Sequence, residues 1–431
     1  MRSTWSSRAR SWFGLAVVAA GCGDDPPDPC AEVTGACVAL PAGTSAAEVD
    51  AAFNEAVDGV TLAFGAGRFA FTTDLQLVAD GVTVRGAGQA ATVLDFAGQT
   101  TGAQGILATG DDVTFEDLTI VDTAGDGLKI EGATGVTLRR VTVEWAGGTP
   151  SEANGAYGLY PVQCADVLIE ACTVRGASDA GIYVGQSDNV IIRDSFASFN
   201  VAGIEIENTT RADVHDNTAT DNTGGILVFN LPGLAIGNGS QARVFDNIVT
   251  GNNTENFAPA GNIVGKVPAG TGLVVLAANK VEMFGNTLAD HQAAHVGIVS
   301  YLPIDEDPGD PSYDPYPTAV YVHDNVITGT STVPNGELGA LLILGISEYN
   351  GGAPIVVPHV TWDGVVDPAR STDGVYPPEL RICVRDNGDG GFLNVNYPTG
   401  TAGSNPPIAD NDASVVDCTL PPLPAVTVPG A

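Results

Sequence analysis

The middle of the chain repeats a pattern in which glycine is followed by an aliphatic residue, any residue, and then a second aliphatic residue or proline. The pattern starts at Gly127, Gly158, Gly181, Gly203 and Gly225, at steps of 31, 23, 22 and 22 residues. Alternating apolar positions predict short β-strands with one buried face. A repeat of this size buries too little apolar surface to fold alone, so copies must stack on one another. The pattern therefore predicts an all-β solenoid of parallel coils.

Polar residues recur between these strands at matching intervals. The aspartates that share one corner of the repeat are Asp117, Asp194, Asp216, Asp246 and Asp324. The asparagines that share one inward position are Asn217, Asn247, Asn286, Asn325 and Asn387. Inward amide side chains can form a ladder along the axis of stacked β-structure. We interpret these asparagines as structural and not as ligands.

The same patterns divide the chain into four segments: a signal peptide at 1–21, a proline-rich linker at 22–43, the solenoid at 44–418 and a Pro-rich tail at 419–431. We expect the tail to be loose. Ser45 precedes apolar residues at helical spacing over 46–57, which predicts a helix that caps the first coil. Long insertions interrupt the coils at about 145–156, 231–242, 252–270, 301–318 and 345–378. On a solenoid such insertions usually gather on one side and build the binding surface.

The N-terminus is typical of an exported chain. Three arginines precede an apolar run over 12–20 that is too short to span a bilayer, and Cys22 follows directly after Gly21. This arrangement resembles the signal of bacterial lipoproteins, which implies cleavage before Cys22 and lipidation of that cysteine. The alternative is an ordinary secretory signal with an incidental cysteine. Gly23 in place of aspartate favours the outer membrane by analogy with other lipoproteins, so we expect attachment to the cell envelope through the N-terminal lipid only.

Acidic residues dominate the charge of the chain. There are 51 Asp and Glu against 17 Lys and Arg, a net charge of −34, and removal of 1–21 would leave −37. Such a surface repels nucleic acid, and it repels polyanionic polysaccharide unless divalent cations intervene. We therefore expect no nucleic-acid partner.

Six cysteines remain after Cys22, an even number in an exported chain. Cys30 and Cys37 near one end, and Cys383 and Cys418 near the other, are candidate disulfides. Cys164 and Cys172 belong to one coil and could be buried thiols or a local bridge. No cysteine or histidine spacing is typical of a zinc site or of covalent haem, so we expect no metal and no cofactor from these residues.

Stacking the coils in register brings the outward residues of successive strands into files. Tyrosine rings stack against sugars, and carboxylates hydrogen-bond hydroxyl groups or hold Ca²⁺. The candidate ligand-binding residues in two adjacent files and at one strand start are Lys129, Glu131, Tyr157, Tyr160, Tyr183, Glu205 and Glu207. We expect their side chains to face outward, and a solvated β face is the alternative interpretation.

The stretch 157–163, continuing through 192–195 to 203–206, resembles mannuronan C5-epimerases, within the wider group of right-handed parallel β-helix proteins that act on carbohydrates. The likeness covers about residues 112–250. It implies a single-stranded right-handed parallel β-helix of about ten to twelve coils, a pectin-lyase-like fold, with a saccharide groove.

Several residues depart from the epimerase pattern. Tyr160 replaces its aspartate, Val162 its histidine and Gln163 its acid, while Val201 and Ala202 stand where it has an Arg-His pair. Abstraction of a proton beside a uronate carboxylate needs a base, an acid and cations for the developing charge. The resemblance therefore implies the fold without the epimerase or lyase catalytic set, and the catalytic residues stay unknown.

Other candidate sites are weaker. Glu205 and Glu207, two apart on one strand, could form a glycosidase pair. His291 and His295 could share a helix face and bind metal, but we favour unrelated surface histidines. The acidic insertion 301–316 could hold Ca²⁺ or a sugar, although a rigid acidic loop is the preferred interpretation.

Two hypotheses of function follow, with a third behind them. In the first, the chain binds an extended polysaccharide at the cell envelope. In the second, it is a non-catalytic scaffold, because it also resembles exported β-helix proteins whose genes lie beside that of a protein like a diheme c-type cytochrome. That resemblance implies an envelope protein partner. The third hypothesis is a polysaccharide lyase or glycoside hydrolase.

Overall fold

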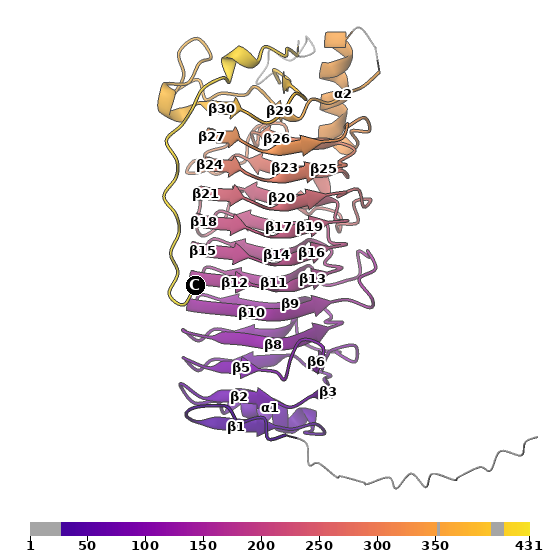
Figure 1. Ribbon diagram of the computed structural model, residues 1–431, viewed down its shortest axis with the longest axis vertical. Coiled ribbons are helices and arrows are strands. Elements are labelled where there is room, and N and C mark those ends of the chain that lie inside the picture. Colours follow the sequence, from indigo (N-terminus) through magenta and orange to yellow (C-terminus); the bar gives the residue numbers. More distant parts are fainter. Residues whose placement is uncertain (1–26, 351–353, 398–408) are drawn as a thin grey trace, which may run out of the picture.

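The computed structural model describes residues 27–350, 354–397 and 409–431, and it forms one parallel β-solenoid (Figure 1). Nearly all strand pairs are parallel and join each coil to the next one along the axis. An 11-stranded sheet and a 20-stranded sheet enclose the core. The expected architecture and number of coils are confirmed.

The 11-stranded sheet, here called sheet B, carries the glycine-aliphatic repeats. Its strands are β4 (Leu75–Leu77), β7 (Gln104–Ala108), β9 (Asp126–Glu131), β11 (Tyr157–Val162), β14 (Ala180–Gly185), β17 (Ala202–Glu207), β20 (Gly224–Phe229), β23 (Thr271–Leu276), β26 (Ala294–Val299), β29 (Val360–Trp362) and β31 (Phe392–Asn394).

The 20-stranded sheet, here called sheet A, contains two ladders that share the long strands β8 (Thr114–Val121) and β10 (Thr134–Glu144). The first ladder adds β1 (Cys37–Leu40), β2 (Thr61–Phe64), β5 (Thr83–Arg85), β12 (Ala165–Glu170), β15 (Asp188–Arg193), β18 (Thr210–His215), β21 (Ser240–Phe245), β24 (Asn279–Phe284), β27 (Thr318–His323) and β30 (Ile382–Arg385). The second adds β3 (Gly67–Ala70), β6 (Thr92–Asp95), β13 (Thr173–Arg175), β16 (Phe196–Ser198), β19 (Thr218–Thr220), β22 (Ile248–Thr250), β25 (Thr287–Ala289) and β28 (Val326–Thr328).

The repeated glycine and the corner aspartate each have a structural reason. A Cβ at Gly203 would lie 2.6 Å from the carbonyl oxygen of Gly225 and 2.8 Å from the amide nitrogen of Asn222, so a side chain there would separate the coils. Ile204 and Ile206 of the same strand are fully buried in the core. The corner at Asp194 has φ of 52°, in the left-handed region that Asp and Asn tolerate better than most residues.

The inward asparagines form the expected ladder. Asn217, Asn247, Asn286, Asn325 and Asn387 donate from one side-chain amide to the next at 2.8–3.1 Å. A second ladder, which the sequence analysis missed, joins Asn200, Asn222 and Asn252 at 2.9 Å. Each amide satisfies buried backbone groups at a corner where neighbouring strands cannot reach them.

The second ladder ends at His291, whose Nε2 lies 3.2 Å from the amide nitrogen of Asn252. The expectation that His291 and His295 are surface residues is wrong, because both are buried and their rings are in contact at 5.4 Å. Burial lowers the pKa of His291 to about 3, which keeps it neutral and able to accept this hydrogen bond.

Both ends of the solenoid are covered. The helix α1 (Ala46–Asn54) begins at Ser45, whose side chain accepts from the backbone of Glu48 in a capping box, and it buries Val49 and Phe53 on the first coils. At the other end lie α2 (Gly336–Asn350), which the sequence analysis did not anticipate, and short 3₁₀ helices at Pro378–Leu380 and Ala413–Val415. A further 3₁₀ turn, η1 (Ile263–Lys266), lies within an insertion. Among the described residues, no helix combines the length and apolarity needed to cross a membrane.

Two disulfides close the pairs that the sequence suggested, Cys30–Cys37 and Cys383–Cys418. Cys164 and Cys172 are buried free thiols. The strand β1 begins at Cys37 and pairs with β2. The solenoid therefore starts inside the segment 22–43, which was expected to be a linker. Cys22 lies outside the described residues.

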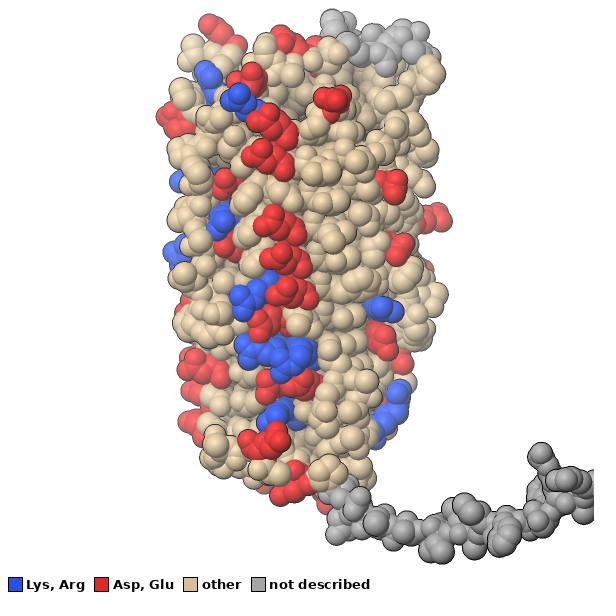
Figure 2. Space-filling view, in the orientation of Figure 1, with Lys and Arg blue, Asp and Glu red and all other residues tan. Residues whose placement is uncertain are grey.

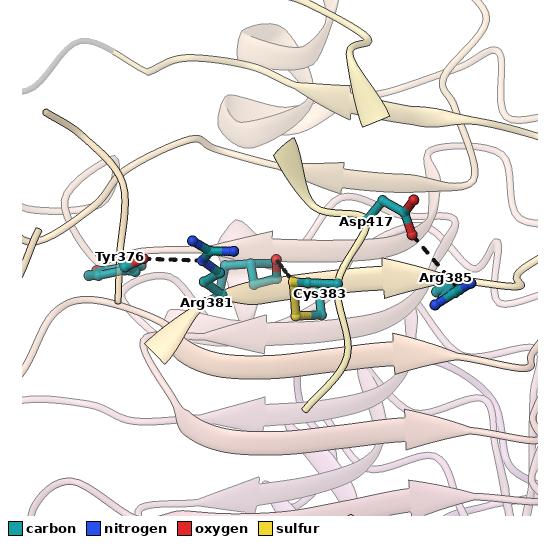
Figure 3. The surroundings of a disulfide bond; sticks show 7 residues. Tyr376, Arg381, Cys383, Arg385 and Asp417 are labelled. Atoms are coloured by element: carbon teal, nitrogen blue, oxygen red, sulfur yellow. Dashed lines mark hydrogen bonds and ion pairs between the residues drawn. A yellow bond between two sulfur atoms is a disulfide. The ribbon is translucent and has the colours of Figure 1, made fainter. Parts of the chain in front are cut away.

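The C-terminal tail is not loose, contrary to expectation. After Cys418 it runs back along sheet A to the level of β12 (Figure 1). The backbone N–H groups of Leu423 and Val426 donate to the carboxylates of Glu282 and Asp213 at 2.9 and 3.1 Å. Val428 packs against Leu168 and Ile191 on the outer side of the sheet. The disulfide fixes the start of this segment, next to the Arg385–Asp417 ion pair (Figure 3).

The asparagine ladder generates a stability prediction. Asn286→Ala removes a side chain that donates to Asn325 and to the carbonyl of Val244 and that accepts from the backbone of Asn247. Because buried polar groups lose their partners, we expect unfolding to become easier by about 2–4 kcal/mol. The measurement is the urea midpoint followed by circular dichroism. Asn411→Ala, at an exposed position, is the control. Equal midpoints for the two variants would contradict a structural role for the ladder.

Candidate functional site

Sheet B carries the predicted files of outward residues in the expected register. Tyr160 pairs with Lys129, and Tyr183 pairs with Glu205, on adjacent strands. Glu207 pairs with Gly185 in the neighbouring file. The stacking of coils therefore brings together side chains that are 22–31 residues apart in the sequence.

The insertions cover this face, as the sequence analysis anticipated. Residues of the segments after β20, around η1 and after β26 pack on the outside of sheet B in a second apolar cluster, separate from the core. Its members include Phe229, Val264, Leu276 and Tyr313. The hydroxyl group of Tyr313 donates to the carbonyl of Asn230 at 2.6 Å and fixes two of these insertions to each other.

Between the insertions a polar cleft of about 380 Å³ opens over β11, β14 and β17. Its walls combine aromatic, acidic and amide side chains with a few aliphatic ones. The lining residues are Tyr157, Tyr160, Asp179, Tyr183, Gln186, Glu205, Glu207, Leu231, Pro232, Leu234, Asn262, Ile263 and Tyr301. None of these described residues is Lys, Arg or His.

Five of the seven predicted residues line the cleft, and two do not. Lys129 lies beside it, with its ammonium group 3.1 Å from Glu131 and 5.4 Å from the centre of the Tyr160 ring. The structure adds Asp179, Gln186 and Asn262, which the sequence analysis missed. Asp179 precedes β14 by one residue, whereas Asn262 comes from an insertion 83 residues away.

The side chains of the predicted files face outward as expected, but three of them are not exposed to solvent. Glu205, Glu207 and Tyr183 point away from the core, but the insertions bury them to 1, 7 and 3% exposure. The rings of Tyr157, Tyr160 and Tyr183 pack on one another with centroids 4.5–5.0 Å apart. Tyr157 and Tyr160 are half-buried, Tyr183 is buried, and all three line the cleft.

The three carboxyl groups of the cleft have different partners. Asp179 accepts from Asn262 at 2.8 Å and from the hydroxyl group of Tyr157 at 3.4 Å. Glu207 accepts from the hydroxyl group of Tyr183 at 2.6 Å. Glu205 Oε2 is buried with no hydrogen-bond partner among the described residues.

Burial and mutual repulsion make these groups hard to ionise. Burial raises the pKa of Asp179 to about 7, and the charge of Glu207 adds to the effect. Burial, followed by the charges of Asp179 and Glu207, raises the pKa of Glu205 well above its ordinary value. Burial also raises the pKa of Glu207, against the hydrogen bond from Tyr183. Near neutral pH the cleft therefore holds carboxyl groups that can donate protons as well as accept them.

The outer face of sheet A differs from the cleft because it carries basic as well as acidic side chains. Figure 2 shows acidic side chains following one another up this face, with basic side chains among them mainly in the lower half. Glu170 lies between the guanidinium groups of Arg139 and Arg193, which outweigh its partial burial and lower its pKa. Asp179, Glu205 and Glu207 form no ion pair with a Lys, Arg or His of the described residues, so they lie outside the ion-pair networks seen there.

The cleft carboxyl groups are not arranged as a metal site. Within the described part of the chain, no three His, Cys, Asp or Glu side chains converge on a point that could hold a metal ion. The chemistry that the cleft can perform with its own groups is hydrogen bonding to hydroxyl groups, aromatic packing and proton transfer.

Comparison with known proteins supports the fold. The family described as the right handed beta helix region matches residues 80–238 and 152–305, which together span more than half of the sequence. The chain belongs to this family. No curated protein sequence matches it.

Two solved structures with a similar architecture are those of a mannuronan epimerase module and of an exopolygalacturonase. The A-module of the mannuronan C-5 epimerase AlgE4 from Azotobacter vinelandii aligns with a TM-score of 0.51 and 17% identity, over 83% of this chain and 94% of the module. An exopolygalacturonase from Thermotoga maritima aligns with a TM-score of 0.45 and 10% identity, over 70% of this chain and 83% of its own. The family match and the likeness to the epimerase module establish a pectin-lyase-like β-helix and nothing about the reaction.

The raised pKa values lead to a prediction about pH. Asp179 in the unfolded chain should titrate near the ordinary value of about 3.9, but in the folded chain it titrates near 7. The folded state then binds more protons between these values, so Asp179 makes stability fall as the pH rises from about 4 to 7. In Asp179→Asn this decline should be shallower by on the order of 1 kcal/mol or more. Urea unfolding at a series of pH values measures it.

Asp305→Asn, at an exposed position, is the control for that series. It should reproduce the pH dependence of the unmodified protein. An Asp179→Asn protein whose stability falls as steeply as that of the control would show that Asp179 is ionised in the folded state.

Proposed function

We propose that the chain binds an extended, uncharged polysaccharide in the cleft over β11, β14 and β17. The observation that carries the proposal is a tyrosine-walled cleft that contains three carboxyl groups and no cation among its described residues. Sugar rings offer an apolar face to the half-buried Tyr160 and hydroxyl groups to the carboxyl and amide groups around it.

The charge of the cleft selects against polyuronates. A uronate carboxylate would add a negative charge to a site where burial and mutual repulsion already oppose the ionisation of Asp179 and Glu205. The net charge of −34 acts in the same direction at longer range. An uncharged polysaccharide avoids both the repulsion inside the cleft and the long-range repulsion by the net charge. Protonated Glu205 can also donate a hydrogen bond to a sugar oxygen.

Affinity electrophoresis tests this proposal. In gels that contain a panel of neutral polysaccharides, including β-glucans, galactomannans and xylans, at least one should retard the protein, whereas alginate and pectate should not. Tyr160→Ala should weaken the retardation about tenfold, because an aromatic contact with a sugar is lost. Tyr321→Ala, on sheet A, is the matched control and should migrate like the unmodified protein. Retardation by polyuronates alone, or equal retardation of both variants, would refute the proposal.

We also propose that the domain reaches its ligand from the cell envelope, where lipid on Cys22 holds it. The support is the order of arginines, apolar run and cysteine at the N-terminus. Cys22→Ala should then leave the protein outside the membrane fraction, and an unchanged distribution would contradict the anchor.

Glycoside hydrolysis is a second candidate, favoured by the different hydrogen-bond partners of the cleft carboxyl groups. Burial raises the pKa of Asp179 to about 7, so this group carries a proton in much of the protein near neutral pH. Glu207 accepts a hydrogen bond from the hydroxyl group of Tyr183. In this hypothesis Asp179 protonates the glycosidic oxygen, and Glu207 takes a proton from the water that attacks the anomeric carbon.

Release of reducing ends from the retarding polysaccharide tests hydrolysis. Asp179→Asn should lower the rate about 100-fold or more, because the proton donor is removed, whereas Asp305→Asn should keep it. If the unmodified protein releases no reducing ends from a polysaccharide that it binds, hydrolysis is excluded and binding stands alone.

A further inference from the structure

The cleft over β11, β14 and β17 contains three buried carboxyl groups and no compensating cation. Asp179, Glu205 and Glu207 are 5, 1 and 7% exposed, and none of the described lining residues is basic. Lys129, which lies beside the cleft, is already paired with Glu131 at 3.1 Å. Buried carboxyl groups are normally paired with cations or with hydrogen-bond donors. The positive charge that would stabilise these groups is therefore not supplied by the cleft itself.

Glu205 is the exception among the buried carboxyl groups of the described residues. Its Oε2 atom has no hydrogen-bond partner among them. The others each accept at least one hydrogen bond, and they are Asp179, Glu207, Asp213, Glu282 and Asp363. A buried acceptor without a partner destabilises a protein, so Glu205 Oε2 calls for a donor from outside the described chain.

The register of sheet B places Glu205 on the side of the cleft. Ile204 and Ile206, on either side of it in β17, belong to the core, so the Glu205 side chain points outward. Its neighbours on the adjacent strands are Tyr183 and Leu227, and both belong to the apolar cluster outside the sheet. Glu205 and Tyr183 both line the cleft. The unpaired carboxyl group therefore faces the ligand space and not the interior of the solenoid.

The groups of the cleft define the chemistry of a ligand. Within the described residues, no three His, Cys, Asp or Glu side chains converge as a metal ion requires. A single positive charge that carries N–H donors suits the site, because it favours ionised carboxylates and can donate to Glu205 Oε2. Tyrosine rings attract cations, and the Tyr160 ring already has the ammonium group of Lys129 at 5.4 Å from its centre. The volume of about 380 Å³ admits a small organic molecule.

We propose that the cleft binds a small organic cation whose primary ammonium group donates to Glu205, and that this cation competes with the polysaccharide. The net charge of −34 attracts such cations at longer range. Competition rests on the proposed function, because it needs a polysaccharide in the same cleft. The ammonium site does not, since the carboxyl groups and the tyrosines are in place without a sugar.

Proton release tests the ammonium site, with n-butylammonium chloride as the probe. Burial raises the pKa of Asp179 to about 7 and that of Glu205 well above its ordinary value, so both groups carry protons near neutral pH. A bound cation favours the ionised carboxylates, and binding should therefore expel protons. A pH-stat held near neutrality should record saturable release that approaches about one proton per protein. n-Butanol and sodium chloride at the same concentrations should give no saturable release.

Two variants provide the control. Glu205→Gln removes the charge at nearly constant shape, and it should raise the concentration for half-maximal release about tenfold or more. Glu306→Gln makes the same change at an exposed position and should behave like the unmodified protein. Circular dichroism and the urea midpoint show whether both variants fold. Release that does not saturate, or equal half-maximal concentrations for the two variants, would overturn the proposal.

A second comparison uses the unmodified protein alone, so it does not depend on the folding of a variant. n-Butyltrimethylammonium carries the same charge without N–H groups and leaves Glu205 Oε2 unpaired. It should need a several-fold higher concentration for half-maximal release. Equally tight binding of this ion, or equal release by n-butanol, would overturn the assignment of a primary ammonium group.

These results separate the two proposals. Saturable release that depends on Glu205, in a protein that no polysaccharide retards, would remove the proposed function and keep the ammonium site. Retardation by a polysaccharide without saturable release would keep the function and remove the site. Where both are observed, n-butylammonium should abolish the retardation and n-butanol should not, and unchanged retardation would overturn the competition.

Discussion

In-register hydrogen bonding between successive coils is the constraint on which the rest of this structure depends. Each strand pairs with its counterpart one coil away, about 4.8 Å along the axis, and a slip by one residue would turn every inward side chain outward. Insertions change the length of a coil without changing this register. The ladder asparagines show it, because consecutive members are separated by 30, 39, 39 and 62 residues and still donate to one another.

The same register decides which parts of the candidate site are readable in the sequence. The files that join Lys129 to Tyr160 and Tyr183 to Glu205 follow from the glycine spacing, since a strand period and a coil period are local properties. The second ladder was also readable, because Asn200 and Asn222 are separated by one repeat of 22 residues.

The burial of the site could not be predicted from the repeat in the sequence. Glu205 looks like an exposed residue in the alternating pattern, and it becomes buried only when the insertions pack over sheet B. How they pack depends on contacts such as that between Tyr313 and the carbonyl of Asn230, which are 83 residues apart and follow no period. The partnership of Asp179 with Asn262 has the same origin. The repeat of the β-coils thus predicts the strands at the floor of the cleft, whereas the walls of the cleft come from insertions that do not repeat.

The C-terminal segment has a practical consequence for how this protein can be handled. Because it doubles back along sheet A and its final residues lie near β12, the polypeptide does not leave the body at the α2 end where the last coil is built (Figure 1). A fluorescent protein or affinity handle fused after Ala431 would therefore emerge from the side of the rod. The fused domain would lie close to β12 and β15, so a flexible spacer would be needed to preserve the packing of Val428 against Leu168 and Ile191.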